Sequence, residues 1–160
     1  SLIVDLRNNP GGLLDSVVDT LRQILPEGMI VYTQTKDGTK KEYTCDGETP
    51  ISIPLVVLVN ENSASASEIF GGAVHDHEIA TLVGTKTFGK GIVQQTFPFT
   101  DGSAIKMTIA KYYTPNGVCI HGEGITPDVE VKFPDDATED VQLNRAVELA
   151  KEKASGATAK

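Results

Sequence analysis

Residues 54–70 decide the fold, because an apolar run passes directly into small polar residues that open a helix. They read Pro-Leu-Val-Val-Leu-Val-Asn-Glu-Asn-Ser-Ala-Ser-Ala-Ser-Glu-Ile-Phe. The run Pro54–Val59 is apolar without alternation, which is typical of a parallel strand covered on both faces. The helix that follows is expected to run to about Asp76. A buried strand that leads into a helix indicates an α/β fold.

The rest of the chain supplies further strands and helices on both sides of this stretch. Short apolar runs, apolar residues at helical spacing, and turns that contain Asp-Gly or Asn-Gly mark them. The expected elements are a strand over Leu2–Leu6, a helix from Leu13 to Leu25, a hairpin of Met29–Gln34 and Lys41–Thr44, a strand over Ala80–Val83, a hairpin of Val93–Phe99 and Ala104–Tyr113, a strand over Val129–Val131, a helix over Glu139–Lys153 and a frayed tail over Ala154–Lys160. This order predicts a single α/β domain.

Composition excludes two classes of function. The 160 residues carry 14 Lys and Arg against 22 Asp and Glu, a formal net charge of −8, and there is no Trp. An acidic surface repels phosphate backbones, so no nucleic-acid partner is expected. The longest nearly apolar stretch, Ile51–Val59, is about half as long as a membrane span requires, so no membrane contact is expected from this chain.

The first residues suggest an excised fragment. The chain opens at Ser1, without Met, and passes at once into an apolar strand. On that interpretation the absence of a signal peptide says nothing of the compartment. Cys45 and Cys119 fit no Cys-x-x-Cys pattern, so both are expected to be unpaired, with a disulfide in an oxidising compartment as the alternative.

The candidate nucleophiles are three serines at this strand-to-helix junction, Ser63, Ser65 and Ser67. A helix start offers free backbone N–H groups and a dipole that favours the negative charge of an attacked carbonyl. The small residues Ala64 and Ala66 would let a substrate backbone approach. The alternative is structural, because Ser65 and Glu68 also have the spacing of a capping box that simply starts the helix.

The histidines are poor partners for this serine. His75 and His77 lie ten and twelve positions after Ser65, which on a helix is roughly 15–18 Å away and beyond hydrogen-bond reach. Residues two apart on a helix point to different sides, so the pair is not a metal site either. Both are expected to be solvated residues at the helix end. His121 remains geometrically possible but has no triad partner beside it.

Lys90 is the candidate base. The run from Gly84 to Lys90 matches the Gly-x-x-x-x-Gly-Lys part of a phosphate-binding loop, but Gly91 replaces the Ser or Thr and a strand-like segment follows, so no nucleotide site is expected. Desolvation in an apolar pocket lowers the pKa of a lysine amine, as a base near neutral pH requires. Gln94, four positions on in an extended chain, could orient the amine. The alternative is a solvated loop lysine.

A second oxyanion donor is available in the run from Asn9 to Gly12. Without a Cβ, a glycine N–H can approach a ligand closely. The alternative is a glycine turn that joins the first strand to the first helix.

Five segments carry a resemblance to a known family. They are Asp5–Gly12 (Asp-Leu-Arg-Asn-Asn-Pro-Gly-Gly), Asn62–Ile69 (Asn-Ser-Ala-Ser-Ala-Ser-Glu-Ile), Thr87–Gln94 (Thr-Phe-Gly-Lys-Gly-Ile-Val-Gln), Tyr113–Gly117 (Tyr-Thr-Pro-Asn-Gly) and Gly124–Asp128 (Gly-Ile-Thr-Pro-Asp). In this order, over about Leu2–Val131, they resemble the carboxyl-terminal processing proteases, also called tail-specific proteases. The run Val118–His121 departs from the more polar run of many members, away from the candidate dyad.

The resemblance implies a site and a fold. The serine of the family precedes its lysine by 25 positions, which selects Ser65 and Lys90 as the dyad. Gln94 would orient Lys90, and the backbone N–H groups of Ala66 and Gly11 would form the oxyanion hole, with Gly12 as an alternative to Gly11. The implied fold is of the Clp protease/crotonase type, a spiral of ββα units with an added β-hairpin.

The resemblance also implies an activity. The chain is expected to be the catalytic core of a serine endopeptidase that cuts proteins near accessible C-terminal tails, outside the cytoplasm, with no cofactor and no metal. Residues 1–134 would form the core, incomplete at its N-terminal side, and residues 135–160 a C-terminal helix and tail. The PDZ domain of the family is absent from this chain. Alternatives are a non-catalytic ligand- or peptide-binding module on the same scaffold and a crotonase-type acyl-CoA enzyme.

Overall fold

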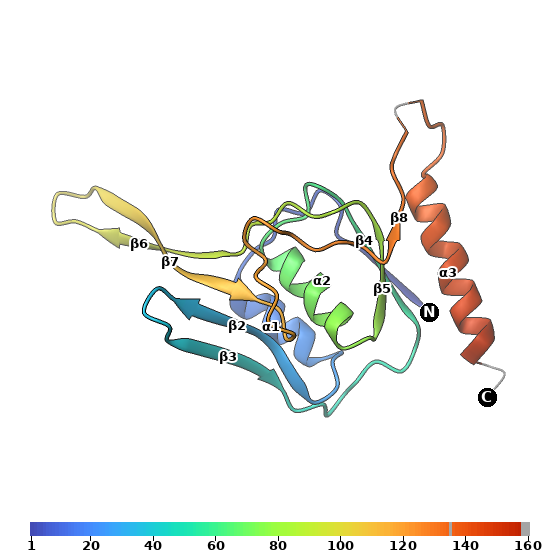
Figure 1. Ribbon diagram of the computed structural model, residues 1–160, viewed down its shortest axis with the longest axis horizontal. Helices are drawn as coiled ribbons and strands as arrows, with labels where there is room; N and C mark the ends of the chain where they lie inside the picture. The colour runs from blue at the N-terminus through green and yellow to red at the C-terminus, as the bar shows by residue number, and fades with distance from the viewer. Residues whose placement is uncertain (135, 158–160) are drawn as a thin grey trace.

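The computed structural model describes residues 1–134 and 136–157, and it contains two four-stranded sheets (Figure 1). The first sheet is parallel, in the order β1-β4-β5-β8. Its strands are β1 (Leu2–Asp5), β4 (Leu55–Val59), β5 (Ala80–Gly84) and β8 (Val129–Glu130). Within these residues, no helix is long and apolar enough to cross a membrane.

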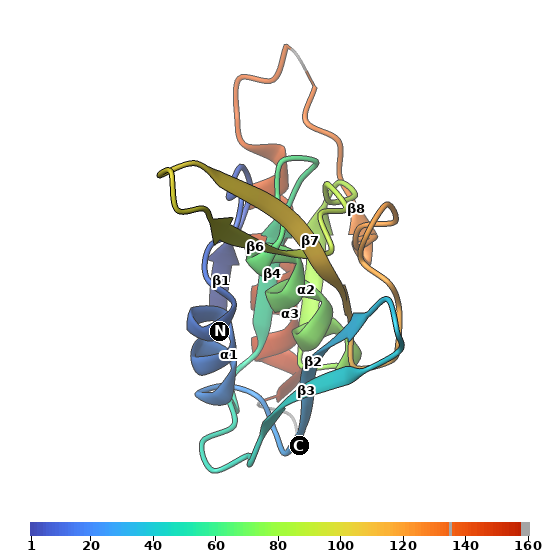
Figure 2. The same cartoon turned by 90° about the vertical axis from the view of Figure 1, so that its left-hand side faces the viewer.

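Helices cover both faces of the parallel sheet, as Figures 1 and 2 show. The helices are α1 (Leu14–Arg22), α2 (Ala66–Asp76) and α3 (Val141–Ala157). On β4, Leu55, Val57 and Val59 pack in one core cluster with α1 and α2. Val56 and Leu58 pack in a second cluster with α3. Because alternate residues of a strand face opposite sides, a strand with a core on each side has no polar position.

The second sheet is antiparallel, in the order β3-β2-β7-β6. It comprises β2 (Gly28–Thr35), β3 (Lys40–Cys45), β6 (Ile92–Pro98) and β7 (Ala104–Tyr113). α2 contacts both β5 and β2, so it lies between the two sheets. β7 pairs with β2 only over Ala110–Tyr113, and the far half of the β6–β7 hairpin projects away from the body (Figure 1).

The predicted elements all occur, with corrections at helix ends. α3 begins at Val141 rather than Glu139. α1 ends at Arg22 rather than Leu25, and the N–H groups of Ile24 and Leu25 both donate to the Leu21 carbonyl in a final turn. The prediction of a frayed tail is wrong for Ala154–Ala157, because these residues belong to α3. Residues 158–160 of that predicted tail lie outside the described part of the chain.

Candidate active site

Ser65 stands between β4 and α2, at the N-cap position of the helix, and it has an unusual backbone. Its φ is 57° and its ψ is −116°, in a region that residues with a Cβ rarely adopt. Such a conformation costs of order 1–3 kcal/mol and persists only where the surroundings impose it. At the start of the helix, the N–H groups of Ser67 and Glu68 donate to the carbonyls of Ala64 and Ser65. The Ala66 N–H has no acceptor among the described residues, so it is the free donor beside the strained serine.

The three serines of this segment, which only the family spacing distinguishes in the sequence, differ in their hydrogen bonds. The Ser63 hydroxyl donates to the Leu6 carbonyl at 2.7 Å, and that side chain is fully buried. The Ser67 hydroxyl donates to the Asn9 carbonyl at 3.0 Å and is also buried. Ser65 is only half-buried. Ser63 and Ser67 therefore hold the connection between β1 and α1 in place, and Ser65 is the serine that solvent reaches.

Glu68 joins the segment around Ser65 to the lysine loop, by which we mean residues Thr87–Gly91. Its side chain is fully buried. One carboxylate oxygen accepts hydrogen bonds from the backbone N–H of Ser65 at 2.9 Å and from that of Lys90 at 2.8 Å. The other oxygen accepts the Gly89 N–H at 2.7 Å and the Thr87 hydroxyl at 2.6 Å. The capping box is therefore present, and it serves more than the helix start. One carboxylate fixes the backbone of both candidate catalytic residues.

The lysine loop is fastened on its other side as well. The Thr87 hydroxyl accepts the Ile125 N–H at 2.7 Å, and the Thr87 N–H donates to the Ile125 carbonyl at 3.0 Å. The Phe88 N–H donates to the Ser63 carbonyl at 3.0 Å. The segment around Ile125 is one of the five motifs, and here it supports the loop that carries Lys90.

The side chains of Lys90 and Gln94 are both exposed. In the part of the chain that the structure describes, neither makes a hydrogen bond or an ion pair. The register between β6 and β7 shifts between Val93 and Gln94, so Gln94 lies at a β-bulge. The structure thus brings the Lys90 backbone to Ser65 through Glu68. It leaves the lysine side chain exposed, so the apolar pocket expected around this amine is not formed here.

The glycine turn after β1 lies directly against Ser65. Gly11 has a φ of 91°, and a Cβ on it would stand 2.5 Å from the Ala64 carbonyl oxygen, 2.7 Å from the Ala66 nitrogen and 2.9 Å from the Ser65 Cβ. Only glycine fits there. A Cβ on Gly12 would meet nothing within 4 Å. Of the two glycines, Gly11 is therefore the one that lies beside Ala66.

The Gly11 N–H has a partner in this structure. It donates to the Asn9 side-chain oxygen at 2.9 Å, while the Asn9 carbonyl accepts the Ala64 N–H at 3.0 Å. An oxyanion that binds here would take over the Gly11 N–H from Asn9. An apolar hollow of about 330 Å³ opens beside this turn, with Gly11, Leu13, Val17 and Phe70 among its lining residues.

The histidines lie elsewhere. The side chain of His75 is 43% exposed, which fits the expected solvated residue, whereas His77 is half-buried. The His75 ring contacts carboxylates on both sides, Asp76 at 3.2 Å and Asp128 at 3.3 Å. A His77 ring nitrogen lies 2.7 Å from the Met29 carbonyl oxygen. Both rings hold α2 against neighbouring segments, which the spacing of helix residues does not reveal. His121 is exposed.

Nothing in the described ranges, 1–134 and 136–157, groups three or more His, Cys, Asp or Glu as a metal site. Cys45 is a buried free thiol and Cys119 a half-buried one, as expected for unpaired cysteines.

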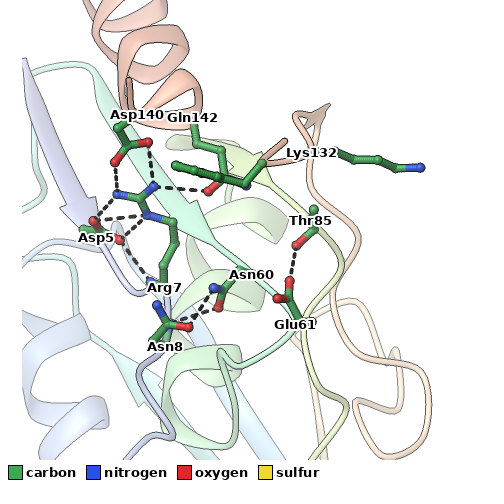
Figure 3. Close-up of a pocket in the computed structure, with 10 residues that line it drawn as sticks. Asp5, Arg7, Asn8, Asn60, Glu61, Thr85, Lys132, Asp140 and Gln142 are labelled. Carbon is green, nitrogen blue, oxygen red and sulfur yellow. Dashed lines mark hydrogen bonds and ion pairs between the residues drawn. The ribbon is translucent and has the colours of Figure 1, made fainter. Parts of the chain in front are cut away.

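A second hollow, of about 530 Å³, opens at the carboxyl ends of the parallel strands (Figure 3). Arg7, whose side chain is 14% exposed, reaches Asp5 at 2.7 Å and Asp140 at 2.8 Å. These bonds raise the pKa of Arg7 and lower the pKa of both carboxyls. Asp140 also accepts the Leu143 N–H at 2.9 Å, as an N-cap residue does. The network joins the end of β1 to the start of α3. The sequence analysis does not predict it, because Arg7 and Asp140 are far apart in the sequence.

Fold and site together have the parts of a serine-nucleophile hydrolase: a strained serine at a helix start, a lysine loop tied to it, and a glycine turn beside the next N–H. The model of peptidase family S41 matches residues 1–131. The chain therefore belongs to peptidase family S41. The resemblance to the carboxyl-terminal processing proteases is confirmed by this match.

Curated relatives carry corresponding names. The chain is 54% identical over 132 residues to a carboxyl-terminal-processing protease of Synechocystis, with 82% of this chain and 31% of that protein covered. It is 47% identical over 136 residues to a probable CtpA-like serine protease of Staphylococcus epidermidis, with 83% and 28% covered. The chain thus spans about a third or less of the length of these relatives.

Solved structures bear out the predicted fold class. The photosystem II D1 C-terminal processing protease superposes with a TM-score of 0.78 at 40% identity, over 82% of this chain and 34% of that one. Tricorn protease shares the fold alone, with a TM-score of 0.60 at 21% identity over 94% of this chain and 15% of that one. The α/β fold of the Clp-like proteases is confirmed.

Proposed function

We propose that this chain is the catalytic core of a serine endopeptidase that uses a Ser65–Lys90 dyad and cleaves proteins near their C-termini. The observation that carries the proposal is the buried Glu68 carboxylate, which hydrogen-bonds the backbone of both residues. A structural cap alone would need only the bond to Ser65. Family membership supports the reaction class, and the names of the relatives support the kind of substrate.

In the proposed mechanism, bound substrate excludes water from the exposed Lys90 amine and so favours its neutral form. The Ser65 hydroxyl then attacks the scissile carbonyl carbon while the Lys90 amine accepts the hydroxyl proton. The developing oxyanion accepts hydrogen bonds from the N–H groups of Ala66 and Gly11. The Gly11 N–H breaks its hydrogen bond to the Asn9 side chain to do so. The Lys90 ammonium then protonates the leaving amine as the peptide bond breaks. Water, deprotonated by Lys90, hydrolyses the acyl-enzyme and restores the Ser65 hydroxyl. Gln94, on the strand that follows, orients the lysine amine.

The remaining parts of the proposal rest on the same family relation. Residues 1–134 form the catalytic core and residues 135–160 its C-terminal helix and tail. The substrates are proteins or peptides with accessible C-terminal tails, and the protein works outside the cytoplasm. No cofactor enters the mechanism.

A fluorophosphonate probe tests the dyad directly, because it forms a covalent bond with an activated serine. We expect labelling of the parent, none of Ser65→Ala, and a rate lower by about 10²-fold or more for Lys90→Ala, the usual contribution of a general base. Ser52→Ala, at an exposed serine ahead of β4, and Lys86→Ala, at an exposed lysine directly before the lysine loop, are the controls, and both should label. Equal labelling of Ser65→Ala and the parent would refute the assignment.

A further inference from the structure

Two turns lie side by side at the candidate active site, and each carries one of the proposed oxyanion donors. The turn after β1 runs from Leu6 to Gly11, and the turn after β4 runs from Asn60 to the helix start at Ala66. A Cβ on Gly11 would stand 2.7 Å from the Ala66 nitrogen, so the two backbones are in close contact. The relative position of the two N–H groups therefore depends on the bonds that hold the turns together.

The Asn60 side chain bonds both turns. Its Oδ1 accepts hydrogen bonds from the Asn8 N–H at 2.9 Å, across to the other turn, and from the Asn62 N–H at 3.1 Å within its own turn. Its Nδ2 donates to the Asn8 side-chain oxygen at 3.0 Å, and Figure 3 shows these two side chains facing each other. One amide thus ties the first turn to the second at Asn8, shortly before Gly11.

Asn60 is in turn held by the core. Its backbone N–H donates to the Ser63 hydroxyl oxygen at 2.9 Å, and that hydroxyl donates to the Leu6 carbonyl at 2.7 Å. The Ser63 side chain is fully buried. The first turn is therefore bonded at Leu6 and at Asn8, and both bonds lead back to Asn60.

Backbone strain shows what these bonds oppose. Asn8 has a φ of 57°, in the left-handed region that residues other than glycine adopt infrequently. A residue stays in such a conformation where its surroundings impose it. The Asn8 N–H is the one that Asn60 accepts from the other turn. Without that acceptor, the first turn is free to relax and to carry Gly11 away from Ala66.

We propose that Asn60 is a positioning residue of the oxyanion hole, which fixes the turn that carries Gly11 against the helix start that carries Ala66. This inference rests on the proposed function, in which both N–H groups bind the oxyanion. Asn60 acts through the turns and not on the reacting atoms. Its contribution belongs to the step that forms the oxyanion, because donors aimed at a developing charge act there and much less in ground-state binding.

The test is the kinetics of fluorophosphonate labelling at Ser65. Varying the probe concentration separates the labelling rate constant from the affinity of the probe. Asn60→Ala removes the acceptor, and Asn60→Ser keeps a hydroxyl that can bond the Asn62 N–H but is too short to reach Asn8. Asn60→Asp keeps the acceptor and is the conservative variant, because the Asn8 amide can rotate to donate to the second oxygen.

A control variant and a second measurement accompany the kinetics. Asn62→Ala removes an amide of the same turn that bonds only the Asn8 side chain among the described residues, and it keeps the backbone N–H that Asn60 accepts. Backbone hydrogen exchange is followed at Ala64, whose N–H donates to the Asn9 carbonyl at 3.0 Å. Exchange at this amide reports directly whether the two turns stay together.

We expect Asn60→Ala and Asn60→Ser to lower the labelling rate constant by about tenfold or more and to leave the probe affinity unchanged, since losing an oxyanion donor outright costs about 10²–10³-fold. Exchange at Ala64 should be faster in both variants. Asn60→Asp should recover most of the rate, and Asn62→Ala should label like the parent. The pH midpoint of labelling should stay at its parent value in every variant, because the base is untouched.

Equal rate constants in the parent, Asn60→Ala and Asn60→Ser overturn the proposal, and so does unchanged exchange at Ala64. A loss that Asn60→Asp does not recover, a loss confined to probe affinity, or a shifted pH midpoint, which places the effect at Lys90, overturns it as well. All these outcomes leave the dyad standing, since the parent still labels. A parent that does not label removes the dyad and, with it, the role of Asn60.

Discussion

β4 and the β6–β7 hairpin are both rich in apolar residues, and they use them in opposite ways. All five residues of β4 are buried, three toward α1 and α2 and two toward α3. The hairpin buries Ala110 and Tyr112 where it joins β2, and exposes its apolar residues beyond that point. β4 is held by packing on two faces, whereas the hairpin has one open apolar face.

The candidate site lies where these two regions meet. Ser65 follows β4, and Lys90 precedes β6. A buried carboxylate, Glu68, connects them, so that the position of the lysine loop depends on the packed side of the molecule. The comparison shows that the backbones of both candidate catalytic residues are held by a buried carboxylate of the core, whereas the far half of the hairpin packs against no other element of the described residues.

The largest expected effect comes from breaking the connection between the two regions. Glu68→Ala would leave buried N–H groups of Ser65, Gly89 and Lys90 without an acceptor. We expect a loss of about 3–5 kcal/mol in the free energy of unfolding, since each buried unsatisfied donor costs roughly 1–3 kcal/mol. Fluorophosphonate labelling should fall as well. Denaturant unfolding measures the first effect and labelling kinetics the second.

Glu61→Gln is the matched control, because Glu61 is an exposed glutamate of the same connection that bonds only Thr85 among the described residues. Glu61→Gln should change neither the free energy of unfolding nor the labelling rate appreciably. If Glu68→Ala unfolds and labels like the parent, the carboxylate does not place the lysine loop.

The next largest effect is expected at the glycine turn. Gly11→Ala forces a Cβ within 2.5 Å of the Ala64 carbonyl and requires a φ of 91°. Backbone strain and overpacking should together cost about 2–4 kcal/mol. Labelling of Ser65 should fall because the turn moves away from Ala66. Gly12→Ala has open space and is expected to behave like the parent in thermal unfolding and labelling. Equal behaviour of the two variants would place the second oxyanion donor elsewhere.

The elements were predictable because their patterns are local. The apolar run over Pro54–Val59 admits few structures other than a doubly covered strand, and β4 is that strand. The Asp-Gly turn between Val93–Phe99 and Ala104–Tyr113 predicted two antiparallel strands, which occur. A turn does not tell whether the apolar residues of its strands are covered, because that depends on what packs against them.

The site was predictable only in part, because it depends on contacts distant in sequence. Ser63, Ser65 and Ser67 are the same residue type, and they differ through bonds to Leu6 and Asn9 that no local pattern shows. The capping-box spacing pointed to Glu68 as a helix cap but not to its bonds with the lysine loop. That spacing was the available signal. The roles of Lys90 and Gln94 stay predictions.

A smaller effect is expected at the Arg7 network, and it depends on pH. Hydrogen bonds from Arg7 lower the pKa of Asp5 and Asp140 from the ordinary value of 3.8. The folded state therefore binds protons less readily than the unfolded chain. The resulting stability is present above about pH 3.8 and is lost as the pH falls through the lowered values.

Asp140→Asn keeps a residue that caps helices well but removes the charge. At neutral pH it should cost about 1 kcal/mol or less, because both carboxylates are partly solvated. The difference from the parent should shrink as the pH falls below 3.8, as denaturant unfolding across pH would show. Asp46→Asn, at an exposed carboxylate outside this network, is the control. A difference that grows in acid would contradict the assigned role of Arg7.

The smallest expected effect sharpens the comparison between the two regions. Met107→Ala removes an exposed side chain from β7 in the far half of the hairpin and should change the free energy of unfolding by less than about 0.5 kcal/mol. Val57→Ala removes a smaller volume from β4, but from a position with no exposed surface, and should cost about 2 kcal/mol. Thermal unfolding compares the two variants. If Met107→Ala costs as much as Val57→Ala, the far half of the hairpin is packed in the folded chain, because only a covered side chain stabilises the fold to that extent.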